Sequence, residues 1–98
     1  MAELLFHRLA KKEAQAAEAW YHARNSDAAA RFRLMVERTA NRIASAPDTY
    51  PFIRSQYRQL RVAGFPYSLI YRVRNDQSVL VVAVAHTSRR PGYWQRRK

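Results

Sequence analysis

The strongest constraint on the fold of this chain is an apolar run near its C-terminus, VLVVAVA at Val79–Ala85. The run is too short for a membrane helix, which needs roughly 20 apolar residues, and its valines favour a strand. Because no polar residue alternates with the apolar ones, both faces of this strand need cover from solvent. The run therefore predicts an interior strand of a sheet.

Three other segments have strand patterns. Glu3–Leu9 is a short first strand, and both Gln56–Val62 and Tyr67–Arg74 alternate apolar with polar residues, as strands with one buried face do. Gly64–Pro66 separates the last two, and Asn75–Gln77 has the composition of a hairpin turn before the apolar run. The C-terminal half of the chain is therefore expected to form the sheet.

Two amphipathic helices are expected between the first and second strands. The first covers Ala10–Arg24, which consists of good helix formers. Residues expected on its packing face repeat at i, i+4, i+7 and i+11 and are Ala10, Ala14, Ala17 and Tyr21. The other faces carry polar residues, which include Lys12, Glu13 and Glu18.

The second helix covers Ala28–Ala46 and follows a short link, so the two helices should form an antiparallel hairpin. Ser26 or Asp27 is the expected N-cap, and the prolines at Pro47 and Pro51 end the helix. The expected buried positions repeat with the same spacing and are Phe32, Val36, Thr39 and Ile43, with Met35 beside them. One flank of this helix is a basic stripe of Arg31, Arg38 and Arg42.

The predicted order of elements is β-α-α-β-β-β. This order is typical of an α+β domain in which a helical hairpin packs on a mostly antiparallel sheet. With 98 residues the chain suits one domain, residues 1–98, because so short a chain buries only one thin core.

Charge narrows the classes of partner. Eighteen Lys and Arg stand against seven Asp and Glu, for a formal net charge of +11. This charge attracts nucleic acid, ribosomes, anionic membranes or an acidic protein, and it does not choose among them. The absence of cysteine excludes disulfides and Cys-based zinc sites. Neither a signal peptide nor a membrane-spanning segment is expected, so a cytoplasmic protein is the expectation.

At this level of detail the chain resembles the RelE/ParE superfamily of type II toxin–antitoxin toxins. The likeness is carried by AKKEAQAAEAWY in the first helix, the Pro47-to-Pro51 break, LRVAGFPYSLIYRV in the paired strands and VVAVAHTSRRPGYW at the end. The resemblance implies a growth-inhibiting toxin of the bacterial cytoplasm, associated with plasmid stabilisation. It also implies a cognate antitoxin in a toxin–antitoxin hetero-oligomer.

The superfamily contains ribosome-dependent mRNA endonucleases and gyrase poisons that share the fold without hydrolysing RNA. Tyr57 and Gln59 stand where the nuclease branch has lysines, and Pro66 and Tyr67 where it has an arginine. Only Arg61 remains basic there. The resemblance therefore favours inhibition of DNA gyrase. A RelE-like mRNA endonuclease and a plain nucleic-acid-binding module remain the alternatives.

RNA cleavage would need a base, an acid and cations around the developing charge. His86 ends the apolar strand and can act as base or acid near neutral pH, or it can be a structural residue bonded to a backbone carbonyl. Tyr93 could be the acid, although packing of the tail by Tyr93 and Trp94 is the preferred interpretation. The candidate catalytic residues are thus His86, Tyr93 and Arg61, and whether the protein is an enzyme stays open.

The segment Arg89–Lys98 is expected to be exposed and basic. The residues expected to contact the target or nucleic acid are Arg61, His86, Arg89, Arg90, Arg96 and Arg97. Trp20 and Tyr21 are expected to pack the first helix. No metal or cofactor is expected, because His7 and His22 lack ligand spacing and no glycine-rich phosphate loop is present. The antitoxin is expected to supply a segment rich in acidic and apolar residues.

Overall fold

The computed structural model describes residues 1–98. Its elements, in chain order, are β1 (Leu4–Phe6), α1 (Arg8–His22), α2 (Ser26–Ser45), β2 (Phe52–Arg54), β3 (Tyr57–Arg61), β4 (Tyr67–Val73) and β5 (Val79–His86). The predicted α+β class and the order of the predicted elements are confirmed. The structure adds one short strand, β2, whose three residues are all exposed and show no alternation of apolar and polar residues.

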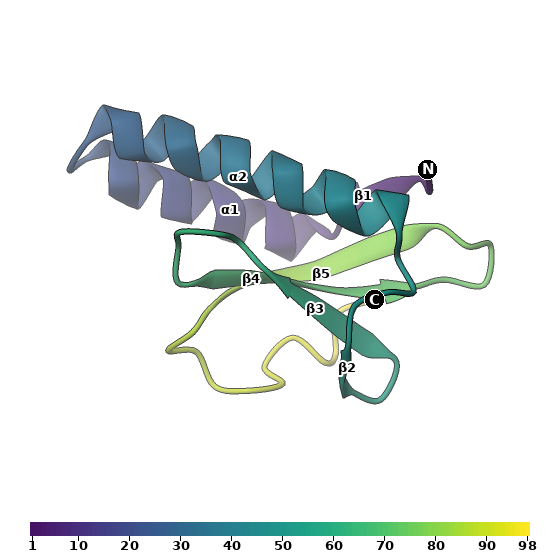
Figure 1. The fold of residues 1–98 in the computed structure, drawn as a ribbon. Coiled ribbons are helices and arrows are strands. Elements are labelled where there is room, and N and C mark those ends of the chain that lie inside the picture. Colours follow the sequence, from purple (N-terminus) through teal and green to yellow (C-terminus); the bar gives the residue numbers. More distant parts are fainter.

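The five strands form one sheet in the order β1-β5-β4-β3-β2. Strand β1 pairs with β5 in parallel, and every other pair is antiparallel. The apolar strand β5 therefore has a neighbour on each side, as its composition predicts. Both helices lie on one side of the sheet, and the C-terminal segment runs across the other side (Figure 1).

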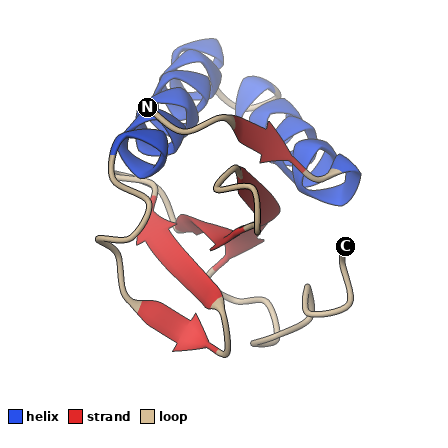
Figure 2. Ribbon diagram, turned by 90° about the vertical axis from the view of Figure 1, so that its right-hand side faces the viewer, coloured by secondary structure: helices blue, strands red, loops and turns tan.

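A β-bulge at Val82 changes which residues of β5 point to each face of the sheet. Ile70 pairs with Ala83 and Tyr71 with Val81, so Val82 has no partner in β4. Val79, Val81 and Val84 consequently belong to the core under the helices, whereas Leu80, Val82 and Ala83 belong to a second apolar cluster with Trp94. The tail thus covers the face that the helices leave open, and the twisted sheet lies between the two layers (Figure 2).

Most element boundaries shift by one to three residues from the sequence prediction, and at the starts of both helices a side chain caps the helix. Strand β1 ends at Phe6 rather than Leu9, because the His7 Nδ1 atom accepts a hydrogen bond from the Leu9 N–H at 3.0 Å and α1 begins at Arg8. The N-cap of α2 is neither Ser26 nor Asp27. Asn25 takes this role, and its side-chain oxygen accepts from the N–H groups of Asp27 at 2.9 Å and Ala28 at 3.2 Å.

The buried faces of the helices agree with their predicted spacing. Ala10 and Ala17 of α1 are buried, as are the predicted core positions of α2, which are Phe32, Val36, Thr39 and Ile43. Tyr21 packs against Phe32 and Phe65, with ring centroids 5.4 and 5.2 Å away. No helix of the structure is both long and apolar enough to cross a membrane.

The packing predicted for Trp20 is wrong. Trp20 is 52% exposed, because the i, i+4 spacing that turns Ala17 and Tyr21 toward the sheet turns Trp20 away from it. The guanidinium of Arg24 lies 3.7 Å above its ring and donates to the Trp20 carbonyl at 2.9 Å. Trp20 is therefore an aromatic side chain on the surface of α1.

Candidate functional site

A hollow of about 610 Å³ opens on the helix-free face of the sheet, between β3, β4 and the C-terminal segment. Its lining contains four arginines and one histidine but no Asp or Glu: Arg54, Arg61, Arg89, Arg90 and His86. We call it the basic hollow. Cations grouped without carboxylates form a site for phosphate or carboxylate groups. The structure thus brings together four of the six predicted contact residues and adds Arg54.

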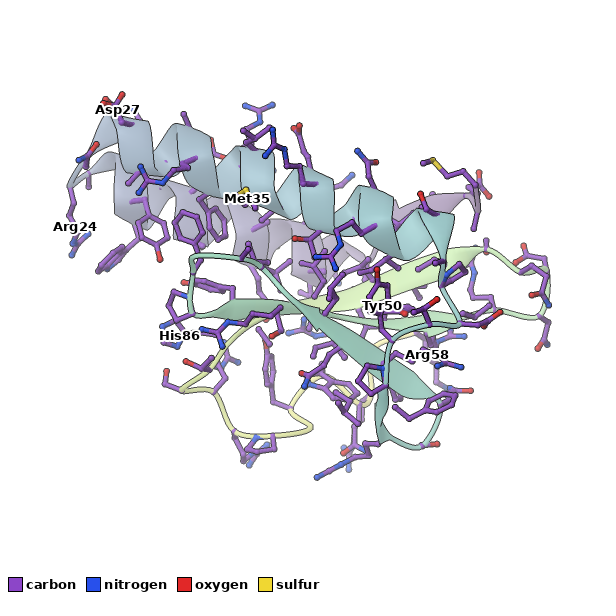
Figure 3. The ribbon with its side chains drawn as sticks, in the orientation of Figure 1. Arg24, Asp27, Met35, Tyr50, Arg58 and His86 are labelled. Atoms are coloured by element: carbon purple, nitrogen blue, oxygen red, sulfur yellow. The ribbon has the colours of Figure 1, made fainter.

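His86 lies at the end of β5, beneath the end of the helical hairpin where Arg24 and Asp27 lie (Figure 3). Its ring meets the edge of Tyr67 at a centroid distance of 5.0 Å. The Nδ1 atom accepts a hydrogen bond from the Ser88 N–H at 2.9 Å. His86 is therefore bonded to a backbone N–H group. The sequence had suggested a bond to a backbone carbonyl as its structural role.

Arginines reach the basic hollow from different elements. Arg61 of β3 donates through Nε to the Phe65 carbonyl at 2.9 Å, which leaves its terminal nitrogens available. Arg54 of β2 donates to the Gln95 side chain at 3.1 Å. The tail passes so close to Arg54 at Gly92 that a Cβ there would lie 2.5 Å from a guanidinium nitrogen. With a φ of 79°, Gly92 also has a backbone conformation that favours glycine.

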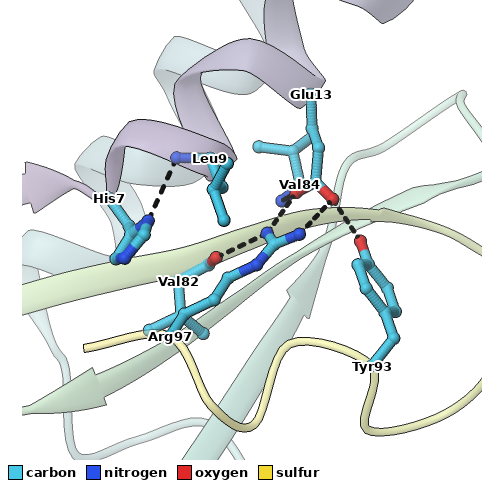
Figure 4. A network of polar contacts seen from close by, with 7 residues as sticks. All are labelled: His7, Leu9, Glu13, Val82, Val84, Tyr93 and Arg97. Atoms are coloured by element: carbon cyan, nitrogen blue, oxygen red, sulfur yellow. Dashed lines mark hydrogen bonds and ion pairs between the residues drawn. The ribbon is translucent and has the colours of Figure 1, made fainter.

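Tyr93 and Trp94 hold the tail against the domain, as the preferred interpretation of the sequence has it. Trp94 is buried and packs on Tyr57, with ring centroids 4.6 Å apart. The Tyr93 hydroxyl donates to Glu13 of α1 at 2.7 Å (Figure 4). Burial, followed by this hydrogen bond to Glu13, raises the pKa of Tyr93 well above its ordinary value.

Arg97 is not an exposed residue of the tail. Its side chain is only 13% exposed and forms an ion pair with Glu13, with Nη1 2.9 Å from Oε1. Nη1 also donates to the Val82 carbonyl at 2.9 Å. The expectation of a fully exposed segment is therefore wrong at Arg97, whereas Arg96 is exposed.

Glu13, which bonds the tail beside the basic hollow, is the residue that the sequence analysis missed. Its expected place on a polar face is wrong, because its side chain is 15% exposed and carries the ion pair. Glu13 lies three residues after Ala10 and four before Ala17, so it shares the face of α1 that meets the sheet. An acidic residue on the packing face of an amphipathic helix is the sequence signal that could have identified Glu13.

A second, smaller hollow of about 410 Å³ lies between α1 and the end of β5. We call it the α1 groove. Apolar residues make up most of its lining and include Ala16, Ala17, Trp20, Tyr21 and Val84. His86 and Arg89 line both hollows, so the two sites adjoin. No three His, Asp or Glu side chains are grouped so that they could hold a metal ion.

The fold, a helical hairpin on one face of a mixed sheet, agrees with the class that the sequence resembles, the RelE/ParE-like toxins. A family model described as "ParE toxin of type II toxin-antitoxin system, parDE" matches residues 4–91. The chain belongs to this family. It is a toxin of a type II toxin–antitoxin system, and its partner is a cognate antitoxin.

Comparison of structures finds a similar fold in a chain described as "Chromosomal ParDE TA system from P. aeruginosa". The TM-score is 0.76 at 16% sequence identity, and the match covers 88% of this chain and 96% of that chain. At this identity the likeness establishes the fold. Comparison with curated proteins finds no match.

Proposed function

We propose that this toxin inhibits DNA gyrase without hydrolysing RNA and binds its target through the basic hollow and Arg96. Membership of the ParE family supports gyrase as the target. The bacterial cytoplasm, where gyrase acts on DNA, is then the proposed site of action. The basic hollow would contact anionic groups of the gyrase–DNA complex through paired arginine donors.

The main support for a non-hydrolytic mechanism is that Tyr93, the candidate acid, and His86, the candidate base, already form hydrogen bonds within the protein. The Tyr93 proton is donated to Glu13, and the raised pKa of Tyr93 makes its release harder. The lone pair of His86 Nδ1 accepts the Ser88 N–H, so the neutral ring carries its proton on Nε2. Neither ring nitrogen is then a free base. This arrangement does not favour RNA cleavage by general acid–base catalysis, which needs side chains that are free to take up and release protons.

Induced expression tests the target directly. The toxin is expressed without antitoxin, and double-strand DNA breaks and mRNA 5′ ends are mapped in the same cells. We expect DNA breaks with intact mRNA, and purified toxin should inhibit supercoiling by gyrase. Cleaved ribosome-bound mRNA with intact DNA would instead establish the endonuclease alternative. If expression is not toxic, both toxin mechanisms are excluded and the nucleic-acid-binding module is the remaining alternative.

Two matched variants separate binding from catalysis. His86→Ala should change toxicity little, whereas Arg89→Ala combined with Arg90→Ala should reduce it strongly through lost anion contacts. A nuclease that used His86 would lose roughly 10²–10⁴ in rate with His86→Ala. Loss of toxicity in His86→Ala at an unchanged thermal midpoint, together with mRNA cleavage by the wild type that the variant lacks, contradicts the non-hydrolytic mechanism.

For the antitoxin we propose the α1 groove as the docking surface. Strand β1 pairs only with Val79–Val81, and Glu13 and Arg97 bond the Val84 N–H and the Val82 carbonyl beyond it, so only the end of β5, Ala85 and His86, lies without a neighbour on that side. Beside this edge lie the exposed Trp20 and the basic Arg89. An extended segment with apolar and acidic residues complements both features. Because His86 and Arg89 also line the basic hollow, such a segment would cover part of the target-binding surface.

Trp20→Ala tests this docking surface. The substitution should weaken antitoxin binding by roughly tenfold or more, because exposed aromatic anchors dominate interface energies, and it should leave toxicity unchanged. Leu34→Ala is the control, since Leu34 is 44% exposed on α2, outside the α1 groove. Titration of purified toxin with antitoxin gives both affinities. Equal affinities for the two variants would place the antitoxin elsewhere.

A further inference from the structure

Glu13 connects the first helix to the last residues of the chain. Its Oε1 atom accepts from the Val84 N–H at 3.0 Å and from Arg97 at 2.9 Å. Its Oε2 atom accepts from the Tyr93 hydroxyl at 2.7 Å and from Arg97 at 3.0 Å. One carboxylate thus receives four hydrogen bonds from β5 and the tail (Figure 4). We call Glu13, Tyr93 and Arg97 the Glu13 cluster.

The Glu13 cluster occupies the part of β5 that β1 leaves without a partner. Glu13 accepts from the Val84 N–H, and Arg97 donates to the Val82 carbonyl at 2.9 Å. Two side chains therefore make the contacts that a neighbouring strand would make. Glu13 and Arg97 are both largely buried, with 15% and 13% of their side chains exposed. Removal of either partner would leave the other charge buried and unpaired, which is unfavourable.

The same cluster reaches the target-binding residues through Tyr93. The Arg89 guanidinium lies 3.9 Å above the centre of the Tyr93 ring. The Tyr93 N–H also donates to the Arg90 carbonyl at 3.3 Å. The position of the Tyr93 ring, which Glu13 determines through the hydroxyl, therefore sets where Arg89 and Arg90 stand at the basic hollow.

We propose that Glu13 is a positioning residue of this toxin, which holds the C-terminal segment so that Arg89 and Arg90 can contact the target. The proposal rests on the proposed function for the role of these two arginines, and it does not depend on gyrase being the target. Glu13 contacts no target group itself. It acts through Tyr93 and Arg97.

Glu13→Gln is the principal test, with Glu18→Gln as the matched control on the same helix. Hydrogen exchange should show faster exchange in residues 89–98 of Glu13→Gln, with β3 and β4 as protected as in the wild type. Growth inhibition on induced expression, and gyrase inhibition where the wild type shows it, should need about tenfold more Glu13→Gln toxin, because charged hydrogen bonds are lost. Glu18→Gln should match the wild type in each measurement.

A spectroscopic signature distinguishes positioning from general stability. Tyrosines labelled with ¹³C in the ring are titrated by NMR, and the Tyr93 resonance is assigned with Tyr93→Phe. In Glu13→Gln the pKa of Tyr93 should fall toward its ordinary value. Besides burial, both the hydrogen bond to Glu13 and the negative charge of Glu13 raise this pKa in the wild type. A folded Glu13→Gln protein with full potency, or with a tail as protected as in the wild type, would overturn the proposal.

Tyr93→Phe decides the question if Glu13→Gln does not fold. It removes only the hydroxyl that Glu13 accepts and leaves the Glu13–Arg97 ion pair intact. We expect a loss of potency of about threefold or more with the fold preserved, because the hydroxyl that is removed donates to a charged carboxylate. Unchanged potency refutes the coupling from Glu13 to Arg89. If the wild-type toxin does not inhibit gyrase, the proposal that gyrase is the target is wrong. The role of Glu13 is then still tested by comparing growth inhibition by the wild type and the variants.

Discussion

At the scale of single residues, Tyr71 shows how one side chain joins the sheet to the link after the helices. It is fully buried in β4, and its hydroxyl donates to the Pro47 carbonyl at 2.6 Å. Arg58 holds the same link through the carbonyls of Asp48 and Tyr50. Burial raises the pKa of Tyr71 to about 12, with a smaller opposing effect of Arg58.

We expect Tyr71→Phe to lower the free energy of unfolding at pH 7 by about 1 kcal/mol, the typical net value of one hydrogen bond. The raised pKa means that the folded state favours the neutral phenol. Its contribution is therefore complete below pH 10 and is lost as the pH rises from 10 to about 12. Urea titrations across this range should show a shallower decline for the variant, and an equal decline would contradict the assignment.

At the scale of elements, the start of α2 depends on one side chain. Asn25 has extended backbone and its side chain accepts two N–H groups of the first turn, whereas Ser26 is already helical. Ser, Asn and Asp are equally good N-caps, and three of them follow one another here. Which of them caps the helix is decided by the path of the chain from α1, where the Asn25 N–H donates to the Tyr21 carbonyl at 2.7 Å.

Asn25→Ala should destabilise the protein by about 1 kcal/mol, because it removes the acceptor of two otherwise unpaired N–H groups. Ser26→Ala is the matched control and should be within about 0.5 kcal/mol of the wild type, as expected at an exposed position. Chemical denaturation of both variants measures the difference. A larger loss for Ser26→Ala would show that the cap is at the position suggested by the sequence.

At the scale of the whole molecule, positive charge is spread over both sides of the sheet. The net charge is +11. Arg31, Arg38 and Arg42 remain exposed along α2, while the basic hollow lies on the opposite side of the sheet. Two of the carboxylates, Glu13 and Asp76, are engaged in hydrogen bonds within the domain. The field around the protein is therefore positive over most of its surface, which attracts an anionic partner from any direction.

This charge predicts a strong salt dependence of association. Raising the ionic strength from about 0.05 to about 0.5 M should slow association with an anionic target or antitoxin by roughly tenfold or more, because screening shortens the range of attraction. The dissociation rate should change much less, because short-range contacts determine it. Stopped-flow or surface-binding kinetics separate the two rates, and a salt effect confined to dissociation would argue against electrostatic steering.

Local patterns in the sequence determined most of the elements. Helical spacing identified the buried faces of α1 and α2, and the apolar run at Val79–Ala85 identified the interior strand. The end of that run also located His86, Arg89 and Arg90, because the residues that follow a buried strand must emerge at the sheet's edge. Each of these inferences needs only neighbours within one or two turns of the chain.

The sequence predicted that Tyr93 and Trp94 hold the tail, but tertiary structure alone decided that the tail is bonded to Glu13. Glu13 and Arg97 are 84 residues apart, and the tail that brings them together has no periodicity from which its path could be read. The bulge at Val82 could not be predicted from the sequence either. A bulge is visible in a sequence when it interrupts the alternation of apolar and polar residues, and this run has no polar residue. The sequence by itself thus determined which residues form elements and which leave the last strand. Long-range packing decided that Glu13 would hold the tail, because burial and pairing of charges depend on what surrounds them.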